Sequence, residues 1–298
     1  MKRFLDSKTS EILSMKPDEL KESIRASEGR VILSENNVVL TQVQPMITNS
    51  EVARAFGADL ILLNLFDVFN CKVNGIDESV ENPVKELRRL TGRPIGVNLE
   101  PVDPDAEMME EKDVISNGRI CSLESIKKAN ELGFDMICLT GNPSTGVTNK
   151  QISKAIKLTK ENFDGLVIAG KMHGSGVGEP IIDEETVEDF INSGADVILI
   201  PAVGTFPGLT VESMKKITDF AHSKGALVMS AIGTSQEASS KETIKQLALL
   251  NKMVGVDIQH IGDAGFSGLA PFKNITELSI ALRGESLTIR MIASSILR

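Results

Sequence analysis

GADVILIPA, residues 194–202, is one of four segments in which a glycine, any residue and an aspartate precede an apolar run. The other copies begin at Gly57, Gly133 and Gly255, so consecutive copies are 76, 61 and 61 residues apart. Each apolar run has the length of a buried strand, and near-continuous apolar strands are typical of parallel sheets that helices cover on the outside. The repeat therefore indicates a fold built from similar strand-and-helix units.

Four further apolar runs lie between or before these copies, at 38–45, 93–101, 165–173 and 225–235. Together they predict eight strands, and apolar residues three and four positions apart predict helices between them. The clearest helical patterns cover 122–134, 149–163, 183–195, 210–226 and 241–255. Eight alternating units, repeating every two strands, favour a closed (β/α)8 TIM barrel over an open sheet.

The chain is predicted to form a single domain over residues 1–298, with a helical extension at 1–35 and the barrel at 36–298. The extension is expected to cover the floor of the barrel, and a long amphipathic helix is expected at about 275–297. A length of 298 residues with 41% hydrophobic residues suits one α/β barrel.

The charge and composition exclude several classes of protein. A net charge of −9, without tryptophan, tyrosine or a basic cluster, argues against binding to nucleic acid. No apolar run approaches the ~20 residues of a membrane span, and the N-terminal stretch lacks the apolar centre of a signal peptide. Three widely spaced cysteines form no disulfide framework. The expectation is a cytoplasmic protein whose partners are small molecules, with a homo-oligomer left open.

Alternation along the strands predicts which side chains face the barrel interior. The residue four positions after each repeat aspartate is always apolar and is expected to face the helices, which places His260 and Asn64 inside. In the other strands the same alternation groups Gln42 with Gln44, Asn98 with Glu100, and Lys171 with His173. Since chemistry in such barrels sits at the C-terminal mouth, these late-strand residues are expected to meet there.

Four of these residues are predicted to be catalytic: Lys171, Glu100, His173 and His260. A lysine inside a barrel must be paired or neutral, and a neutral lysine is a nucleophile or base, while Glu100 and His173 can move protons. The structural alternative is a buried ion pair between Lys171 and Glu100. The polar residues predicted to bind substrate around them are Gln44, Asn64, Asn98, Thr140, Asn142 and Asp263.

A metal site is the alternative chemistry for the same group. Glu100, His173, His260 and Asp263 are ligand types for a divalent metal, although no cofactor is firmly implied. For each histidine, a hydrogen-bonded interior position without chemistry is an equally good interpretation.

Glycine-rich segments follow the last two strands, AIGTSQEAS at 231–239 and HIGDAGFSG at 260–268. Loops at these positions often bind phosphate in TIM barrels through backbone N–H groups, so no lysine or arginine is required. The predicted phosphate-binding residues are Gly233, Thr234, Ser235, Gly265, Ser267 and Gly268. The alternative is that these glycines only permit tight turns.

The segments FGADLILLNLFDVFN, LTGRPIGVNLEPVD, LTGNPSTGVTN, AGKMH, FAHSKGALVMSAIGTSQE and HIGDAGFSG resemble an uncharacterised bacterial TIM-barrel family whose members are often labelled haloacid dehalogenase-like hydrolases. The resemblance spans nearly the whole chain and implies the barrel fold, without supplying a catalytic residue. A dehalogenase site needs an Asp-x-Asp motif after a strand of an open sheet, whereas FLDSKTSE offers Asp6 followed by Lys8. At the level of fold the chain resembles phosphate-binding barrels that act on sugar phosphates.

These observations predict an enzyme that acts on a small phosphorylated, carbohydrate-like substrate as an aldolase (lyase) or as an epimerase or isomerase. Lys171 would form a Schiff base or act as general base. Two alternatives stay open, a metal-dependent lyase or hydrolase and a non-catalytic barrel that binds a phosphorylated ligand.

Overall fold

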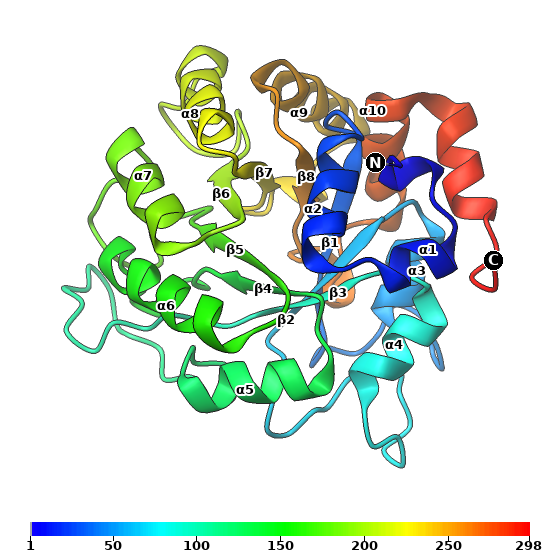
Figure 1. The fold of residues 1–298 in the computed structure, drawn as a ribbon, viewed down its shortest axis with the longest axis horizontal. Helices are drawn as coiled ribbons and strands as arrows, with labels where there is room; N and C mark the ends of the chain where they lie inside the picture. The colour runs from blue at the N-terminus through cyan, green and yellow to red at the C-terminus, as the bar shows by residue number, and fades with distance from the viewer. Residues whose placement is uncertain (1) are drawn as a thin grey trace.

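A computed structural model, which describes residues 2–298, shows eight parallel strands that close into a barrel in their order along the chain. The strands are β1 (Val31–Asn37), β2 (Leu60–Asn64), β3 (Ile95–Asn98), β4 (Met136–Leu139), β5 (Leu166–Gly170), β6 (Val197–Pro201), β7 (Leu227–Ile232) and β8 (Ile258–Ile261). Helices surround them as an outer ring (Figure 1). The predicted (β/α)8 TIM barrel is confirmed.

The helices follow the predicted pattern closely. They are α1 (Thr9–Ser14), α2 (Pro17–Arg25), α3 (Asn49–Ala55), α4 (Pro83–Thr91), α5 (Leu123–Leu132), α6 (Asn149–Asn162), α7 (Glu184–Ser193), α8 (Val211–Ser223), α9 (Lys241–Val254) and α10 (Phe272–Ala293). Short 3-10 turns are η1 (Phe4–Asp6), η2 (Gln236–Ala238) and η3 (Phe266–Gly268). The long C-terminal helix is interrupted at Gly284, whose φ of 77° lies outside the helical region.

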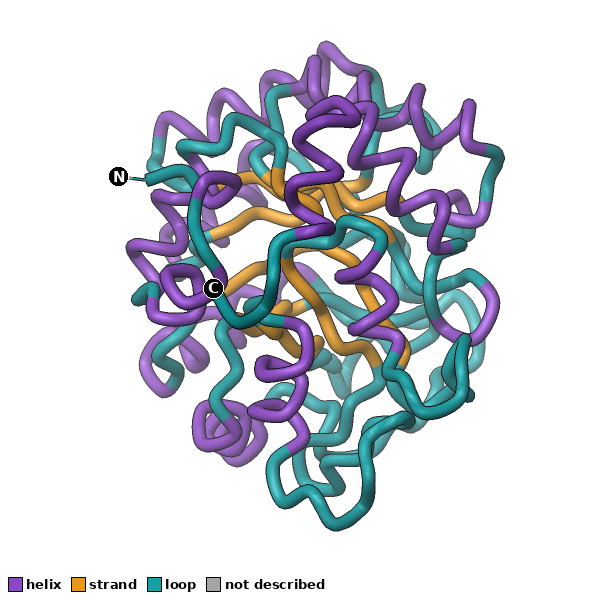
Figure 2. The backbone as a smooth tube through the Cα atoms, turned by 90° about the vertical axis from the view of Figure 1, so that its right-hand side faces the viewer, coloured by secondary structure: helices purple, strands orange, loops and turns teal. Residues whose placement is uncertain are grey.

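Two apolar layers hold the barrel together. The outer layer packs alternate strand residues such as Leu63 and Ile261 against the helices. The inner layer fills the barrel with residues such as Leu62 and Leu199, and the N-terminal segment adds Phe4, Ile12 and Ile24 to it. The predicted faces of β2, β4, β6 and β8 are therefore confirmed, and the N-terminal helices close the barrel floor. In Figure 2 the strands lie inside and the helices outside.

The repeat aspartates fasten neighbouring strands together at that floor. The carboxylates of Asp59, Asp135, Asp196 and Asp257 accept hydrogen bonds of 2.8–3.0 Å from the backbone N–H groups of Ile32, Ile95, Val167 and Val228. Each carboxylate also has a basic partner, namely Arg283, Arg88, Lys160 and His222 in the same order. The glycine-x-aspartate repeat is thus a structural device of the fold.

The first strand was predicted wrongly. Residues 38–45 form a loop, and β1 lies earlier, at Val31–Asn37, inside the range predicted as helical extension. Its second half, Ser-Glu-Asn-Asn, is polar, so it does not look like a barrel strand, yet it pairs with β2 and β8. As a consequence, Glu35 enters the barrel and Gln44, which was predicted to point inward, is exposed on the loop.

Candidate active site

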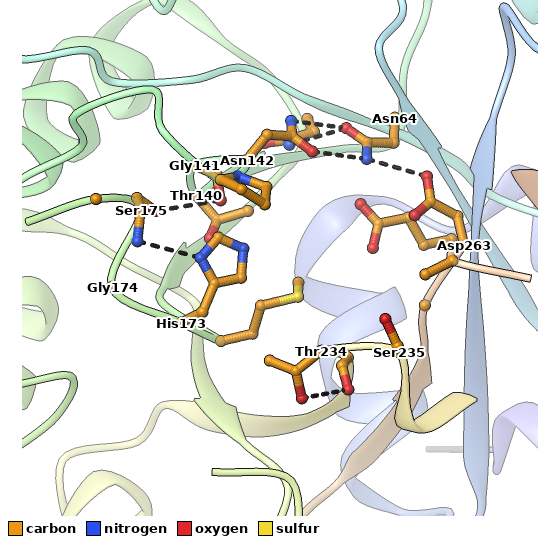
Figure 3. Close-up of a pocket in the computed structure, with 18 of the residues that line it drawn as sticks. Asn64, Thr140, Gly141, Asn142, His173, Gly174, Ser175, Thr234, Ser235 and Asp263 are labelled. Carbon is orange, nitrogen blue, oxygen red and sulfur yellow. Dashed lines mark hydrogen bonds between the residues drawn. The ribbon is translucent and has the colours of Figure 1, made fainter. Parts of the chain in front are cut away.

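A cavity of about 530 Å³ opens at the C-terminal ends of the strands. Nine of the predicted site residues line it: Asn64, Asn98, Thr140, Asn142, His173, Gly233, Thr234, Ser235 and Asp263. Figure 3 shows His173 and Asp263 on opposite sides, with Thr234 and Ser235 along a third. The mouth of the barrel therefore gathers polar groups from six different strand ends, as expected for this fold.

Asn64, at the end of β2, is the centre of an amide network. Its Nδ2 group donates to Oδ1 of Asn142 at 3.0 Å and to Oδ2 of Asp263 at 3.1 Å. Its Oδ1 accepts from Nδ2 of Asn142 at 3.1 Å and from Nδ2 of Asn98 at 3.2 Å. Asn64 thereby fixes both the amide wall of the cavity and the position of the Asp263 carboxyl (Figure 3).

Glu100 holds this network from outside the cavity. Its Oε1 accepts from Arg119 Nη2 at 2.6 Å and from Asn142 Nδ2 at 2.9 Å, and its Oε2 accepts from the Asn142 backbone N–H at 2.8 Å. Every one of these bonds positions Asn142 or neutralises the carboxylate. The structural alternative considered for Lys171, an ion pair with Glu100, is therefore wrong, because Glu100 pairs with Arg119.

Lys171 does not line the cavity, and its predicted direction is wrong. In β5, Leu166 and Ile168 face the interior, and the inward alternation continues to Met172, which lines the cavity. The Lys171 side chain is fully buried and pairs with Glu179. Burial lowers the pKa of the Lys171 ammonium, although the Glu179 bond opposes this. Glu179 also accepts from the Asn149 backbone N–H at 2.6 Å, so the pair ties the loop after β5 to α6.

His173 does reach the cavity, and a local bond orients its ring. The Ser175 backbone N–H donates to Nδ1 of His173 at 3.1 Å. Because Nδ1 accepts, the neutral ring carries its proton on Nε2. Burial lowers the pKa of His173, so this neutral form prevails at neutral pH. His173 can therefore donate a hydrogen bond to a bound molecule without carrying charge.

Glu35 and His260 form a buried pair, of which only His260 was predicted from the sequence. His260 Nε2 lies 2.9 Å from Oε2 of Glu35, and both side chains are buried. Glu35 lines the cavity, whereas His260 lies behind it. Period-two alternation from Val31 and Leu33 would have placed Glu35 inside, had 31–37 been recognised as a strand. His260 therefore positions a carboxylate and does not face the cavity itself.

Three further carboxyls, those of Glu110, Glu237 and Asp263, share the cavity with Glu35. Burial raises the pKa of Asp263 to about 7, and the charges of Glu35 and Glu237 add to this effect. Glu237, on η2, was not predicted; its Oε1 accepts from the Ala264 backbone N–H at 3.0 Å. Burial also raises the pKa of Glu237. Asp263 thus has the pKa of a group that can take up and release a proton near neutral pH.

The predicted phosphate loops divide into two parts. Gly233, Thr234 and Ser235 line the cavity. Gly265, Ser267 and Gly268 do not: a Cβ at Gly265 would lie 2.0 Å from the Leu269 carbonyl oxygen, and one at Gly268 would lie 2.5 Å from Asn37 Cβ. These glycines allow the loop after β8 to pack on its own chain and on β1, so a structural role explains them.

The alternative metal ligands are not assembled. Glu100 is engaged by Arg119 and Asn142, and His260 lies behind Glu35. Within residues 2–298, no three histidine, cysteine, aspartate or glutamate side chains lie close enough together to hold a metal ion.

Comparison with known proteins establishes the family and the fold. The chain belongs to the family described as a domain of unknown function, DUF7916, which matches residues 5–298. A comparison with curated proteins finds no match. The haloacid dehalogenase label gains no support from these findings. In the part of the chain that is described, residues 2–298, none of the helices has the length and apolar character needed to cross a membrane.

Two solved structures of similar fold carry informative descriptions. An archaeal fructose 1,6-bisphosphate aldolase is 14% identical, with a TM-score of 0.55 over 87% of this chain and 96% of that chain. A 2,3-dimethylmalate lyase, a PEP mutase/isocitrate lyase superfamily member, is 12% identical, with a TM-score of 0.50 over 83% of this chain and 81% of that chain. At such identities the likeness establishes the barrel alone.

Proposed function

We propose that this member of the DUF7916 family is a lyase-type enzyme that cleaves a carbon–carbon bond in a small hydroxylated substrate, with Asp263 as general base. The observation that carries the proposal is a carboxyl with a pKa of about 7 in a polar cavity at the barrel mouth, opposite a neutral histidine. Aldolase and lyase barrels of similar fold support it by analogy only.

The proposed reaction is a retro-aldol cleavage of a β-hydroxy carbonyl compound. Asp263 takes the proton of the hydroxyl group, the carbon–carbon bond breaks, and its electron pair moves into an enolate whose oxygen accepts a hydrogen bond from His173 Nε2–H. Asp263 then returns its proton to the enolate carbon, which releases two carbonyl products and restores the enzyme.

The amide network holds the base in place for this reaction. Asn64 donates to Asp263 and is itself held by Asn142, which Glu100 and Arg119 anchor. Asn64, Asn142 and Glu100 are therefore proposed to be positioning residues. Lys171 is given no catalytic part, because its buried ammonium is paired with Glu179 outside the cavity.

One observation supports a phosphorylated substrate, and another argues against it. In the described chain, the backbone N–H groups of Gly233, Thr234 and Ser235 donate to no other protein group, as a phosphate cradle would require. Against this, the charged side chains that line the cavity are all carboxylates, which repel an anion. An uncharged or cationic substrate fits the cavity better.

The test is turnover of a panel of β-hydroxy carbonyl compounds in D2O, followed by NMR. Cleavage products with deuterium at the former enolate carbon are expected, and Asp263→Asn should lower kcat/KM by a factor of about 100 or more. Asp219→Asn, which removes an exposed carboxyl on α8, is the matched control. Deuterium exchange without cleavage would indicate epimerase or isomerase chemistry instead.

Two results would overturn the proposal. If wild type and Asp263→Asn turn over a substrate equally fast, Asp263 is not the base. If no compound in the panel reacts while inorganic phosphate or a sugar phosphate binds, a non-catalytic phosphate-binding barrel is the better interpretation.

A further inference from the structure

We propose that the substrate of this cavity carries a positively charged amino group, which Glu237 and Asp263 bind. This inference rests on the proposed function of the same site, because it specifies the class of substrate. The inference is carried by two observations. Two buried carboxyls share one cavity, and acceptor atoms around them have no hydrogen-bond partner.

The charges that face the cavity all have one sign. The ionisable acidic residues that line it are Glu35, Glu110, Glu237 and Asp263, and among residues 2–298 neither lysine nor arginine lines it. The basic side chains of Arg119 and Lys171 are already paired with other carboxylates, Arg119 with Glu100 and Lys171 with Glu179. A cavity whose charges are all negative favours a positively charged ligand.

Unused hydrogen-bond acceptors lead to the same ligand. Oε2 of Glu237 and Oδ1 of Asn98 are buried within the lining of the cavity and accept no hydrogen bond from residues 2–298. Glu237 as a whole residue is only 2% exposed, so water competes little for its carboxyl. Buried acceptors without partners are costly, and they call for a ligand rich in donors. An ammonium group offers three donors and no acceptor.

A directly ligated metal ion is a poorer occupant than an amine. A metal needs several ligand atoms at short, fixed distances, and within the described chain no group of three suitable side chains meets that need. An ammonium needs only two or three acceptors at ordinary hydrogen-bond distances. The carboxyls of Glu237 and Asp263, with the Asn98 carbonyl oxygen, provide them.

Because Asp263 takes up a proton near neutral pH, the affinity for a charged ligand should depend on pH in a direction set by the ligand's charge. Asp263 faces Glu35 and Glu237, the amide of Asn64 and, behind Glu35, His260. Since burial and these negative neighbours raise its pKa to about 7, the carboxyl loses its charge as the pH falls below neutrality. A bound cation should therefore bind more tightly at pH 8 than at pH 6, whereas a bound phosphate should show the opposite dependence.

The experiment measures the Kd of three compounds of similar size by titration calorimetry or ligand-observed NMR: 2-amino-1,3-propanediol, glycerol and glycerol 3-phosphate. The amine is expected to bind at least about tenfold more tightly than the other two at pH 8, which is the range of a charge-assisted hydrogen bond. Glu237→Gln and Asp263→Asn should each remove most of this preference, while Glu212→Gln on the surface of α8 should retain it. Circular dichroism of each variant checks that it is folded.

The possible results separate the substrate class from the proposed reaction. Amine preference without turnover of aminated hydroxy carbonyl compounds would retain this inference and contradict the proposed function. Equal binding of amine and glycerol, or tighter binding of the phosphate, overturns this inference whatever the activity. Amine binding that requires added Mg²⁺ and disappears with EDTA would assign the carboxyls to a metal and also overturn it.

Discussion

Replacing Asp263 by asparagine is expected to stabilise the protein at pH 8 while it removes the proposed base. Burial, with the negative charges of Glu35 and Glu237, raises the pKa of the Asp263 carboxyl from 3.8 to about 7. A carboxyl whose pKa is raised by folding binds its proton more tightly in the folded state. Stability is therefore lost as the pH rises from 3.8 towards 7, and asparagine avoids this loss.

The size of the effect follows from these two pKa values. Each pH unit between them corresponds to about 1.4 kcal/mol, so the destabilisation by ionised Asp263 approaches ~4 kcal/mol above pH 7. Less than half of it, ~1–2 kcal/mol, has developed at pH 5. The free energy of unfolding of Asp263→Asn, relative to wild type, should therefore rise by ~2–3 kcal/mol between pH 5 and pH 8.

Urea unfolding followed by circular dichroism at both pH values measures this difference. Asp219→Asn, at an exposed carboxyl, should show no comparable change between pH 5 and pH 8. A variant Asp263→Asn that becomes less stable relative to wild type as the pH rises would refute the reasoning. It would mean that the bond from Asn64 stabilises the ionised carboxylate more than burial destabilises it.

Two further substitutions and one labelling experiment test the other structural assignments. Asp59→Ala should destabilise the protein by ~3–5 kcal/mol in urea unfolding, because it leaves the fully buried Arg283 guanidinium without its partner; a loss below ~1 kcal/mol would contradict a structural role for the repeat. Gly268→Ala should cost ~1 kcal/mol or more, because φ is +71° and the new Cβ would meet Asn37; unchanged thermal stability would argue against this packing. Borohydride with keto substrates should leave Lys171 unmodified in mass spectrometry, because its ammonium is buried against Glu179; a reduced adduct there would restore the Schiff-base mechanism.

The closed barrel could be predicted from sequence because its signals are local and repeated. The glycine-x-aspartate segments show their period directly, and alternation from each aspartate assigned Leu63 and Ile261 to the helix side correctly. Helix ends obey equally local rules, since the side chains of Ser122 and Thr210 cap α5 and α8 by accepting from the backbone N–H groups of Ser125 and Ser213. These features depend on residues close together in the chain.

The wrong predictions concern strands in which residues of the site interrupt the usual alternation of polar and apolar residues. The C-terminal half of β1 is polar because it delivers Glu35 to the cavity, so it did not look like a strand. Both faces of β5 are apolar, so the sequence does not show which alternate residues of this strand face the barrel interior. The inward direction was therefore assigned wrongly to Lys171, whereas Met172 points inward. Functional sites are where local sequence rules are expected to fail.

The pairing of Glu35 with His260 could not be predicted from either segment alone. These residues are 225 positions apart and meet only because β1 pairs with β8, with Leu33 opposite His260 in the register. Glu237 was missed for a related reason: it follows β7 on a 3-10 turn, where neither helix nor strand periodicity assigns a direction. Both carboxyls become visible only when the barrel is closed.

The most direct test of the proposed active site is the titration of the Asp263 carboxyl itself. ¹³C NMR of protein labelled at the aspartate carboxyl carbon, compared with Asp263→Asn to assign the signal, gives its pKa. A pKa near 7 is expected for the protein alone, and binding of 2-amino-1,3-propanediol, a cation, should lower it. A value close to 3.8, the ordinary value for aspartate, would contradict the assignment of Asp263 as the base of this cavity.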